Sequence, residues 1–508
     1  MSSNLIAGGK RLLSCCSPSR WIQFFHLEHV MRLLVTKFGG TSVGSAEAIR
    51  GLTAITTTNR TTWDHVVVVV SALSGVTDKL LNIVRVAQTT GDAAAVATLH
   101  AELRQRHHDV IGELLDAEQA AIQTEIDGLL DECARLCEGV RVLGELTPRT
   151  LDAIAGLGER MSARIVAATL RHLGVPAQHF DASDLIVTDD RYQDASPLMP
   201  ETTERTTATL GPILDQGITP VVTGFIGATL AGVKTTLGRG GSDWSAAILG
   251  AALEASEVWI YTDVDGVMTA DPRIAPDAHV ISTLSYNEIS ELAYYGAKVL
   301  HPKTIRPVVE RGIPLRVKNT FNPSHPGTVI VGKTEPIVGA IKAVTAIHNL
   351  TMITVAGRGM LGVPGIAART FGAVAREDAS ILMISQASSE QSICFVIPDG
   401  GAKRVVESLN QELAVELERR DIDTIALEEG VSIITAVGAG MRGTTGVAKR
   451  VFSAIGDAEI NVIAIAQGSS ECAISLVVSG DSAKAGVRAI HALTYRETIN
   501  AQHRPPCE

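Results

Sequence analysis

The sequence has little of what a nucleic-acid-binding or membrane-spanning protein requires. Its 508 residues carry a formal charge of −11 at pH 7 and no block of basic residues, which argues against nucleic acid or an anionic membrane as the main partner. Its longest apolar run, residues 66–70, is far shorter than a membrane-spanning helix and is typical of a buried parallel strand. With 45% apolar and 19% charged residues, the composition indicates a soluble globular protein of about two to four domains.

Cysteine is also scarce. The seven cysteines are scattered, and Cys133 and Cys137, which share a helical face, have no matching His or Cys pair at zinc-ligand spacing. We therefore interpret them as buried thiols and expect no metal site built from protein side chains alone. Such cysteine usage favours a reducing compartment, and we predict a cytoplasmic protein.

Residues 1–30 differ in composition from the rest of the chain. They contain three basic residues and several serines, but no acidic residue before Glu28. This composition is compatible with a targeting peptide. We favour an unstructured leader or a start placed too early, because Met31 directly precedes the first strand-like stretch. The fold prediction therefore begins at Met31.

The most informative stretch is residues 34–44, an apolar run followed by two glycines, two hydroxyls and a helix-like segment. A strand, a glycine turn and a helix in this order direct free backbone N–H groups toward an anion. Gly39 and Gly40 would let the backbone approach phosphate oxygens, and Lys37 would supply a positive charge during phosphoryl transfer. The pattern is neither a P-loop nor a dinucleotide fingerprint, and by itself it is equally compatible with a plain strand-to-helix connection.

A second glycine-rich stretch, residues 235–247, contains Arg239 among three glycines, with Ser242 and Asp243 at the start of a predicted helix. Helix capping explains Ser242 and Asp243, but it does not explain an arginine among glycines. The planar guanidinium of Arg239 suits a carboxylate or a phosphate. We therefore predict a second anion-binding loop here.

Weaker candidates follow a predicted strand or begin a predicted helix. Ser71 and Thr77 come after the apolar run 66–70, where a ligand would bind in an open α/β sheet, although helix capping is the simpler explanation. Glu159 opens an apolar helix, where the helix dipole favours a carboxylate and where the side chain could also hold a substrate ammonium. Lys298, beside a predicted helix break, could reach a nucleotide phosphate or be a solvated lysine.

Strands and helices alternate from residue 34 to about residue 330, which predicts an α/β fold with a mostly parallel sheet and helices on both faces. Four blocks in this region resemble aspartokinases of the amino-acid-kinase superfamily, in family order: residues 37–42, 237–243, 262–266 and 295–302. The resemblance implies an αβα sandwich that transfers a phosphoryl group from ATP to the side-chain carboxylate of L-aspartate. The products would be ADP and 4-phospho-L-aspartate, in the first step of lysine, threonine and methionine biosynthesis.

The same resemblance implies a role for each matching residue. Lys37, Arg239 and Asp243 would carry the catalysis, and Mg²⁺ would bridge the ATP phosphates. The substrate would be contacted by Thr77, Glu159, Arg239, Gly240, Gly241 and Ser242. The nucleotide would be contacted by Lys37, Gly39, Gly40, Ser42, Thr262, Asp263, Met268, Arg273, Lys298 and Val299. Met268 departs from the family pattern, since many relatives have a tyrosine there that stacks on adenine, and methionine makes a softer contact.

The C-terminal part of the chain repeats itself at a constant offset of 81 residues, for example from Gly357 to Gly438. Each copy reads as a βαββαβ unit, which predicts α+β, ferredoxin-like domains with an antiparallel sheet and helices on one face. The repeat resembles paired ACT domains, small amino-acid-sensing modules, and the resemblance implies that Gln386 and Gln467 contact an effector. A packing scaffold without a ligand is the alternative.

The two repeat units differ in the number of strands that their own residues can supply. The first unit has a fourth strand available in residues 421–427, whereas the second ends its last helix near Leu493 and has only a polar segment after it. We therefore predict that residues 337–347, ahead of the first unit, lend a strand to the second unit. The predicted domains are a catalytic domain at 31–330, ACT units at 337–428 and 429–495, and a polar tail at 496–508.

The Gln-x-Ser-Ser-Glu turns in both repeats most resemble the threonine-sensitive branch of the family, including the kinase half of the fused aspartokinase–homoserine dehydrogenases. We expect inhibition by threonine, with lysine as the alternative, and a homo-oligomer (dimer or tetramer) formed through the ACT domains. We expect no dehydrogenase activity from this sequence. Two other functions remain open: another amino-acid or carbamate kinase of the same superfamily, and a non-catalytic ACT sensor, which could dispense with Lys37 and Asp243.

Overall fold

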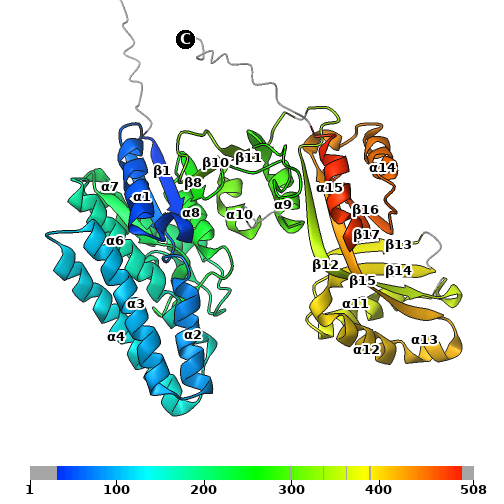
Figure 1. The fold of residues 1–508 in the computed structure, drawn as a ribbon, viewed down its shortest axis with the longest axis horizontal. Helices are drawn as coiled ribbons and strands as arrows, with labels where there is room; N and C mark the ends of the chain where they lie inside the picture. The colour runs from blue at the N-terminus through cyan, green and yellow to red at the C-terminus, as the bar shows by residue number, and fades with distance from the viewer. Residues whose placement is uncertain are drawn as a thin grey trace, which may run out of the picture. The chain divides into compact units, whose positions relative to one another are not determined.

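The computed structural model describes residues 31–494, except for residues 297–299, 301, 336, 362, 388–390 and 469. Two large sheets and one small sheet organise this part of the chain, and Figure 1 shows the order of the elements. None of the described helices is both long enough and apolar enough to cross a membrane.

The N-terminal sheet has eight strands in the order β3-β5-β2-β1-β8-β10-β11-β9. Neighbouring strands run parallel except for β10 and β11, so the mostly parallel sheet predicted from the sequence is confirmed. The strands are β1 (Leu33–Phe38), β2 (His65–Val70), β3 (Ala177–Phe180), β5 (Thr219–Thr223), β8 (Glu257–Thr262), β9 (Thr283–Ser285), β10 (Leu315–Asn319) and β11 (Thr328–Val331).

The centre of this sheet is buried on both faces. Successive side chains of a strand point in opposite directions, so each central strand contributes to two apolar clusters. In β2, Val66, Val68 and Val70 pack into one apolar cluster, and Val67 and Val69 pack into another. The first cluster includes residues of α1 (Ala46–Asn59), α2 (Val76–Thr89), α3 (Ala93–Leu114), α4 (Gln119–Leu143), α5 (Pro148–Ala155) and α6 (Leu157–His172). The second includes residues of α7 (Met199–Asp215), α8 (Gly241–Ala252), α9 (Tyr286–Tyr294) and α10 (Pro302–Arg311).

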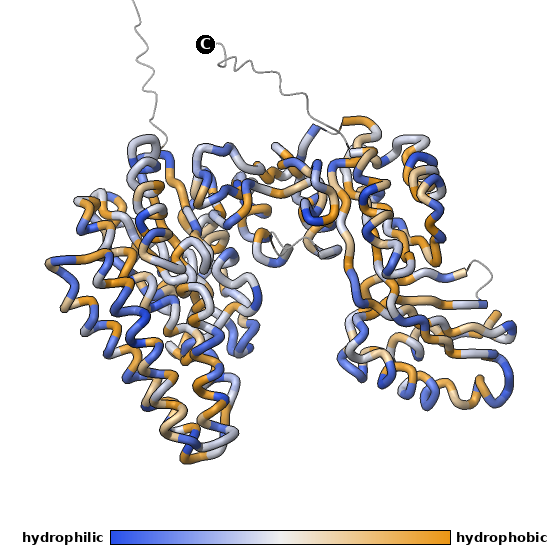
Figure 2. Tube along the Cα trace, in the orientation of Figure 1, coloured by the Kyte–Doolittle hydropathy of each residue, from blue (hydrophilic) through white to orange (hydrophobic). Residues whose placement is uncertain are grey.

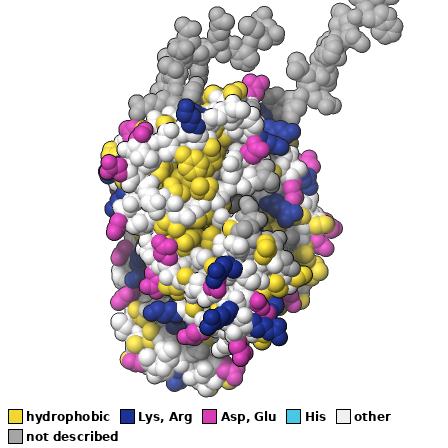
Figure 3. Space-filling view, turned by 90° about the vertical axis from the view of Figure 1, so that its right-hand side faces the viewer, with side chains coloured by type: hydrophobic (Ala, Val, Ile, Leu, Met, Phe, Trp, Pro, Cys, Tyr) yellow, Lys and Arg dark blue, Asp and Glu magenta, His cyan; other side chains and the backbone are white. Residues whose placement is uncertain are grey.

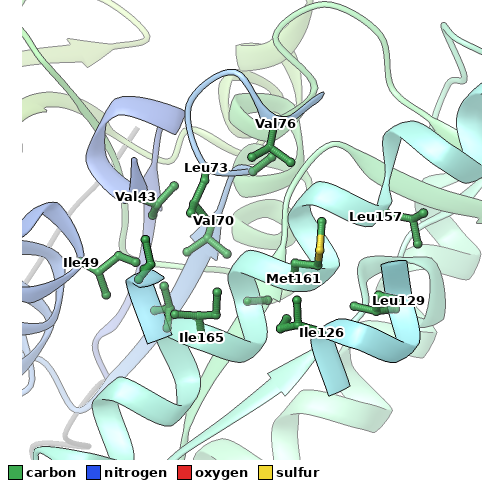
Figure 4. Packing of buried hydrophobic residues seen from close by; sticks show 14 of the residues in the cluster. Val43, Ile49, Val70, Leu73, Val76, Ile126, Leu129, Leu157, Met161 and Ile165 are labelled. Atoms are coloured by element: carbon green, nitrogen blue, oxygen red, sulfur yellow. The ribbon is translucent and has the colours of Figure 1, made fainter. Parts of the chain in front are cut away.

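Helix amphipathicity explains how the first cluster forms. Along α3 and α4, hydrophilic and hydrophobic segments alternate in Figure 2, and the apolar side chains of these helices, such as Leu103 and Leu130, are fully buried. Figure 4 shows Met161 of α6 between Val70 of β2 and the α4 residues Ile126 and Leu129. The long α2–α4 segment is therefore part of the same core as the sheet.

A small three-stranded sheet, β4 (Val187–Thr188), β6 (Ile226–Thr229) and β7 (Lys234–Thr236), leads directly into the Arg239 loop. Its position is fixed by Asp152, which is 2% exposed. The Asp152 carboxylate accepts hydrogen bonds from the backbone N–H groups of Gln193 and Thr236 and from the Thr236 hydroxyl. Burial raises the pKa of Asp152, and these three donors oppose that effect.

The C-terminal sheet has six strands in the order β13-β14-β12-β15-β17-β16, and all neighbouring pairs are antiparallel. The strands are β12 (Ala343–Ala356), β13 (Met383–Gln386), β14 (Ser392–Pro398), β15 (Thr424–Val437), β16 (Ala464–Gln467) and β17 (Ala473–Ser479). The helices are α11 (Ile366–Arg376), α12 (Ala402–Glu412), α13 (Ala414–Arg419), α14 (Val447–Asp457) and α15 (Ala483–His491).

Two long strands run through both copies of the repeat. In β12, residues 343–347 pair with residues 433–437 of β15, and residues 352–356 pair with residues 424–428. The register shifts between these two halves, near Leu350. The segment that precedes the first copy therefore lies beside the first strand of the second copy.

The surface of the C-terminal units includes exposed apolar side chains. Figure 3, turned toward the side where these units lie in Figure 1, shows hydrophobic side chains gathered between charged residues. Ile384 of β13 and Ile465 of β16, the two outermost strands of the sheet, are 48% and 46% exposed.

Candidate active site

Lys37 and Asp243 form the charged centre of the site. Lys37 is the fifth residue of β1, between β2 and β8 in the middle of the sheet, and Asp243 is in the first turn of α8. The Lys37 Nζ lies 2.5 Å from Asp243 Oδ1, and the two side chains are only 11% and 17% exposed. The ammonium group of Lys37 is therefore held in one place by the helix that follows the Arg239 loop.

The Gly39-Gly40 turn connects β1 to α1 through the short helix η1 (Gly40–Val43). Gly39 donates its backbone N–H to Tyr261 O at 3.3 Å, which ties the turn to β8. A Cβ on Gly40 would lie 3.3 Å from Ala72 O, so only glycine fits there without displacement of the loop after β2. Ser42 is fully buried, and its hydroxyl is hydrogen-bonded to Thr320 Oγ1 at 2.6 Å.

The Arg239 loop depends on glycine for its shape. Gly238 and Gly240 have φ values of 76° and 74°, a left-handed conformation that favours glycine. Arg239 itself is exposed, and no carboxylate of the described residues forms an ion pair with it. Its guanidinium is thus available for an anionic ligand.

Glu159 is a buried carboxylate at the start of α6. It is 4% exposed, and its Oε2 atom has no hydrogen-bond partner among the residues that the structure describes. Burial raises the pKa of Glu159 to about 8, although a backbone hydrogen bond from Ala72 and the nearby charge of Lys37 act in the opposite direction. An unpaired, buried acceptor of this kind is suited to a cationic ligand group.

These groups surround one cavity of about 320 Å³, within the usual range for small-molecule sites. The cavity brings together a large part of the predicted catalytic and substrate set, namely Lys37, Thr77, Glu159, Arg239, Gly240, Gly241, Ser242 and Asp243, and it also contacts Ser71. It therefore combines two cations with two carboxylates and the N-terminus of α8. An amino acid with a second carboxylate has matching charges.

Phe225 also lines this cavity, and the sequence did not identify it as a site residue. Its φ of 69° is unusual for a residue with a large side chain, and the Ser245 hydroxyl accepts a hydrogen bond from its backbone N–H. A Cβ on Gly241 would lie 2.7 Å from the Phe225 ring, so the two loops fit closely together. The signal available in the sequence was its position after a buried strand, which is where ligands bind in α/β sheets.

The predicted nucleotide residues Thr262, Asp263, Met268 and Arg273 do not line this cavity. Thr262 ends β8, and its hydroxyl donates to Asp263 Oδ1 at 3.1 Å. Arg273 is highly exposed and paired with Asp271 at 2.7 Å. Lys298 and Val299 lie outside the described residues.

The two predicted effector glutamines lie at matching places in the repeat. Gln386 lines a cavity of about 370 Å³ with Met360 and Gly365, and Gln467 lines one of about 250 Å³ with Met441 and Gly446. In the second cavity the Glu471 carboxylate accepts the backbone N–H of Gly443 at 2.7 Å. Both cavities have room for an amino acid.

Comparison with known proteins decides the family. The amino acid kinase family model matches residues 32–319, and the ACT domain model matches residues 353–413 and 434–493. Aspartokinase 2, chloroplastic, of Arabidopsis thaliana is 33% identical over 464 residues, which cover 90% of this chain and 83% of that protein. The chain belongs to the aspartokinase family. It combines an amino acid kinase domain with C-terminal ACT domains, as the sequence motifs predict.

Two further proteins are similar to this chain over most of its length. Bifunctional aspartokinase/homoserine dehydrogenase 2, chloroplastic, of Arabidopsis thaliana is 37% identical over 90% of this chain and 50% of its own length, so the chain spans about half of that relative. The solved structure of Escherichia coli aspartokinase III in complex with aspartate and ADP is 31% identical, with a TM-score of 0.75. It covers 91% of this chain and 99% of its own.

Glu288 connects the amino acid kinase domain of this chain to the second ACT unit. This residue of α9 is fully buried, and its Oε2 accepts hydrogen bonds from the Ser285 N–H and hydroxyl at 2.7 and 2.8 Å. The same oxygen lies 3.2 Å from Lys342 Nζ, and Oε1 accepts the backbone N–H of Ala439 at 2.7 Å. One carboxylate thus caps a helix of the kinase domain and holds a glycine turn of the ACT unit.

Proposed function

We propose that this protein is an ATP-dependent aspartate kinase that converts L-aspartate and ATP into 4-phospho-L-aspartate and ADP. The observation that supports this best is the 320 Å³ cavity, which both Arg239 and Glu159 line. We assign Arg239 to the α-carboxylate of the substrate and Glu159 to its α-ammonium group. The side-chain carboxylate of the substrate would then extend toward Lys37. The complex of the Escherichia coli relative with aspartate and ADP supports the same assignment.

In this proposal the protein positions the reactants and stabilises charge, because the nucleophile is already an ionised carboxylate. One side-chain carboxylate oxygen of aspartate attacks the γ-phosphorus of ATP, the bond from that phosphorus to the bridging oxygen breaks, and ADP leaves. Lys37 offsets the negative charge that develops on the transferred group, while Asp243 keeps the Lys37 ammonium in place. Ser242 and Thr77 are assigned to the substrate because both line the cavity.

The nucleotide is assigned to the Gly39-Gly40 turn and to the residues after β8. Glycines in this turn would let the backbone approach a phosphate closely, and Thr262 and Asp263 are at the end of the neighbouring strand β8 and just after it. We retain Met268 and Arg273 in this assignment. When bound, Mg²⁺ would neutralise charge on the phosphates and take its ligands mainly from phosphate and water oxygens.

A panel of acceptors tests the substrate. ADP release is measured with L-aspartate, L-glutamate, N-acetyl-L-glutamate and carbamate at equal concentration. The proposal expects kcat/KM to be highest for L-aspartate, with the other three acceptors lower by about 10²-fold or more. The reason is that Arg239 and Glu159 would hold the α-groups of the substrate, so only a side chain of one length brings its carboxylate to Lys37. A higher value for any other acceptor would assign the protein to a different kinase of the superfamily.

The protonation of Glu159 gives a testable pH dependence. The kcat/KM for L-aspartate should rise with pH up to about 8, because the pKa of the free carboxyl is about 8 and only its ionised form pairs with the substrate ammonium. Glu159→Gln should lower kcat/KM at pH 8 by about 10²-fold and remove this rise. Identical pH profiles for both proteins would exclude the proposed contact.

The raised pKa of Glu159 also makes the free energy of unfolding depend on pH. Its folded pKa of about 8 lies above the ordinary value of 4.5, so the folded protein binds the extra proton between these values. The free energy of unfolding of the unliganded protein should therefore fall as pH rises from about 4.5 to about 8, and Glu159→Gln should lack this contribution. Urea unfolding of both proteins at several pH values measures the difference.

We further propose feedback inhibition by threonine, with lysine as the alternative effector. The effector would bind beside Gln386 or Gln467 in the cavities of the two ACT units. Gln386→Ala and Gln467→Ala should each leave kcat unchanged and raise the threonine concentration for half-inhibition by about tenfold if that glutamine makes the contact. Full inhibition of both variants at the wild-type concentration would remove these glutamines from the effector site.

Assembly, domain limits and compartment complete the proposal. The exposed Ile384 and Ile465 at the outer strands of the ACT sheet support a homo-oligomer formed through these units. We propose that the catalytic domain ends at residue 330 and that the first ACT unit ends at residue 428, as predicted from the sequence. The free cysteines of the described residues support a reducing compartment, for which we propose the cytoplasm, although the plant relatives are chloroplastic.

A further inference from the structure

A second, larger cavity lies on the side of the kinase sheet that α1 partly covers. It measures about 770 Å³ and is lined by α1, by β8 and β10 and by the loop after β10. It shares no lining residue with the 320 Å³ cavity, and none of the predicted nucleotide residues lines it. Its volume lies within the range of small-molecule sites.

The side chains that face this cavity come from one face of neighbouring strands. Trp259 and Tyr261 of β8 alternate with residues that are buried on the opposite face, and Lys318 of β10 is the parallel partner of Tyr261. The Trp259 and Tyr261 rings are in edge contact, with centroids 6.3 Å apart. The Tyr261 ring is stacked on Phe38 and is 1% exposed, so it supports Trp259 from behind. Phe321, just after β10, also lines the cavity and is 60% exposed. The cavity therefore has an aromatic wall and an aromatic rim.

Lys318 gives this aromatic cavity a cation. Its side chain is mostly buried (the residue is 8% exposed), and its Nζ donates to His325 O at 2.9 Å and lies 5.3 Å from the Trp259 ring centroid. No carboxylate of the described residues lies within 4 Å of this ammonium group. A buried ammonium without a counter-ion is costly, and an anionic ligand would reduce that cost.

Asn59, at the end of α1, also lines the cavity and is 7% exposed. Its amide lies beside the Tyr261 hydroxyl, and the hydrogen bond between them opposes the rise in the Tyr261 pKa that burial causes. Asn59 therefore helps to hold the Tyr261 side chain, and Lys318 is the charged group that a ligand would meet.

We propose that this cavity is a binding site for a small planar aromatic acid, whose ring packs against Trp259 and Phe321 and whose carboxylate pairs with Lys318. The only acidic residue on the lining is Glu47, which is exposed at the first turn of α1. The site is separate from the phosphoryl-transfer cavity and does not depend on which acceptor the kinase uses.

A ligand in this cavity would affect the Gly39-Gly40 turn, to which we assign the phosphates. Thr320, which lines the cavity, is hydrogen-bonded through its hydroxyl to Ser42 at 2.6 Å. Tyr261, which also lines the cavity, accepts the Gly39 N–H through its backbone oxygen. A ligand that shifts either contact changes the affinity for ATP, and ATP then changes the affinity for the ligand by the same factor.

Direct binding tests the site without use of the kinase reaction. Equilibrium dialysis of the full chain with 2-naphthoate should give saturable binding with a dissociation constant on the order of 1 mM or lower. The neutral isostere 2-naphthamide and the non-aromatic cyclohexanecarboxylate should each bind about tenfold more weakly, because each lacks one of the two features. Absence of saturable 2-naphthoate binding, or equal binding of the three probes, would overturn the proposal.

Three variants locate the bound probe. Gly51 of α1 lines the cavity, and a Cβ there would meet nothing within 4 Å, so Gly51→Leu fills the cavity without strain and should abolish binding. Gly128→Leu on α4 makes the same change at an open position away from the cavity and should leave binding unchanged. Lys318→Met should remove the preference for the acid over the amide. Wild-type binding by Gly51→Leu would place the probe elsewhere and refute the assignment.

Discussion

Lys37→Met is expected to lower kcat for phosphoryl transfer by about 10³-fold or more, and also to lower the free energy of unfolding, because Asp243 then lies mostly buried without its counter-charge. Removal of one preorganised positive group at a developing charge costs a factor of this size in comparable sites. Methionine keeps the length and the apolar stem of the side chain, so the packing of β1 between β2 and β8 is preserved. Single-turnover measurement of ADP formation at saturating ATP and aspartate gives the rate of the step itself.

The matched control for this prediction is Lys79→Met. Lys79 lies on α2, pairs with Glu102 at the surface and does not line the 320 Å³ cavity. Its loss should change kcat by less than about twofold, since exposed ion pairs contribute little. If Lys37→Met, shown to be folded by circular dichroism, retained more than about one tenth of the wild-type kcat, the assigned role of Lys37 would be wrong.

Glu288→Ala is expected to have the largest effect on stability, about 3–5 kcal/mol, since it removes one partner of a buried ion pair and leaves several donors unsatisfied. The carboxylate is fully buried and interacts with Ser285, Lys342 and the backbone of Ala439. Because these partners belong to the kinase domain and the ACT units, the transition that separates them should move to a lower urea concentration. Urea unfolding followed by fluorescence measures this midpoint.

A double-mutant cycle shows whether the pair itself is responsible. Lys342→Met alone should also destabilise the protein, because Glu288 is then buried without its counter-charge. Glu288→Ala combined with Lys342→Met should cost less than the sum of the two single changes. Additive effects, or a loss of less than about 1 kcal/mol in Glu288→Ala, would show that the contact contributes little to the connection.

Many of the residues that line the 320 Å³ cavity could be selected from the sequence because the signals are local. Lys37 is separated from Gly39 by one residue, and Arg239 from Ser242 by two, so each loop shows its chemistry within a few positions. The sequence also indicated the mostly parallel sheet, since alternating strands and helices allow few other arrangements. The sequence could not predict which of these loops face one another in the folded protein.

The contacts that were missed are long-range or depend on backbone conformation. Glu288 and Ala439 are far apart in sequence, and nothing local to Glu288 distinguishes an ordinary helix cap from one that also holds another domain. Phe225 enters the site through a positive φ, which its residue type disfavours. The pairing of residues 343–347 with 433–437, by contrast, could be argued in advance from the number of strands that each unit needs.

The chemical identity of the product tests the central claim most directly. The protein is incubated with ATP, Mg²⁺, L-aspartate and hydroxylamine, which converts an acyl phosphate into a hydroxamate. The account predicts aspartyl hydroxamate from the wild-type protein, a loss of about 10³-fold in Lys37→Met, and lower yield when threonine is added. Folded wild-type protein that forms no aspartyl hydroxamate under these conditions would contradict the assignment of aspartate as the phosphoryl acceptor.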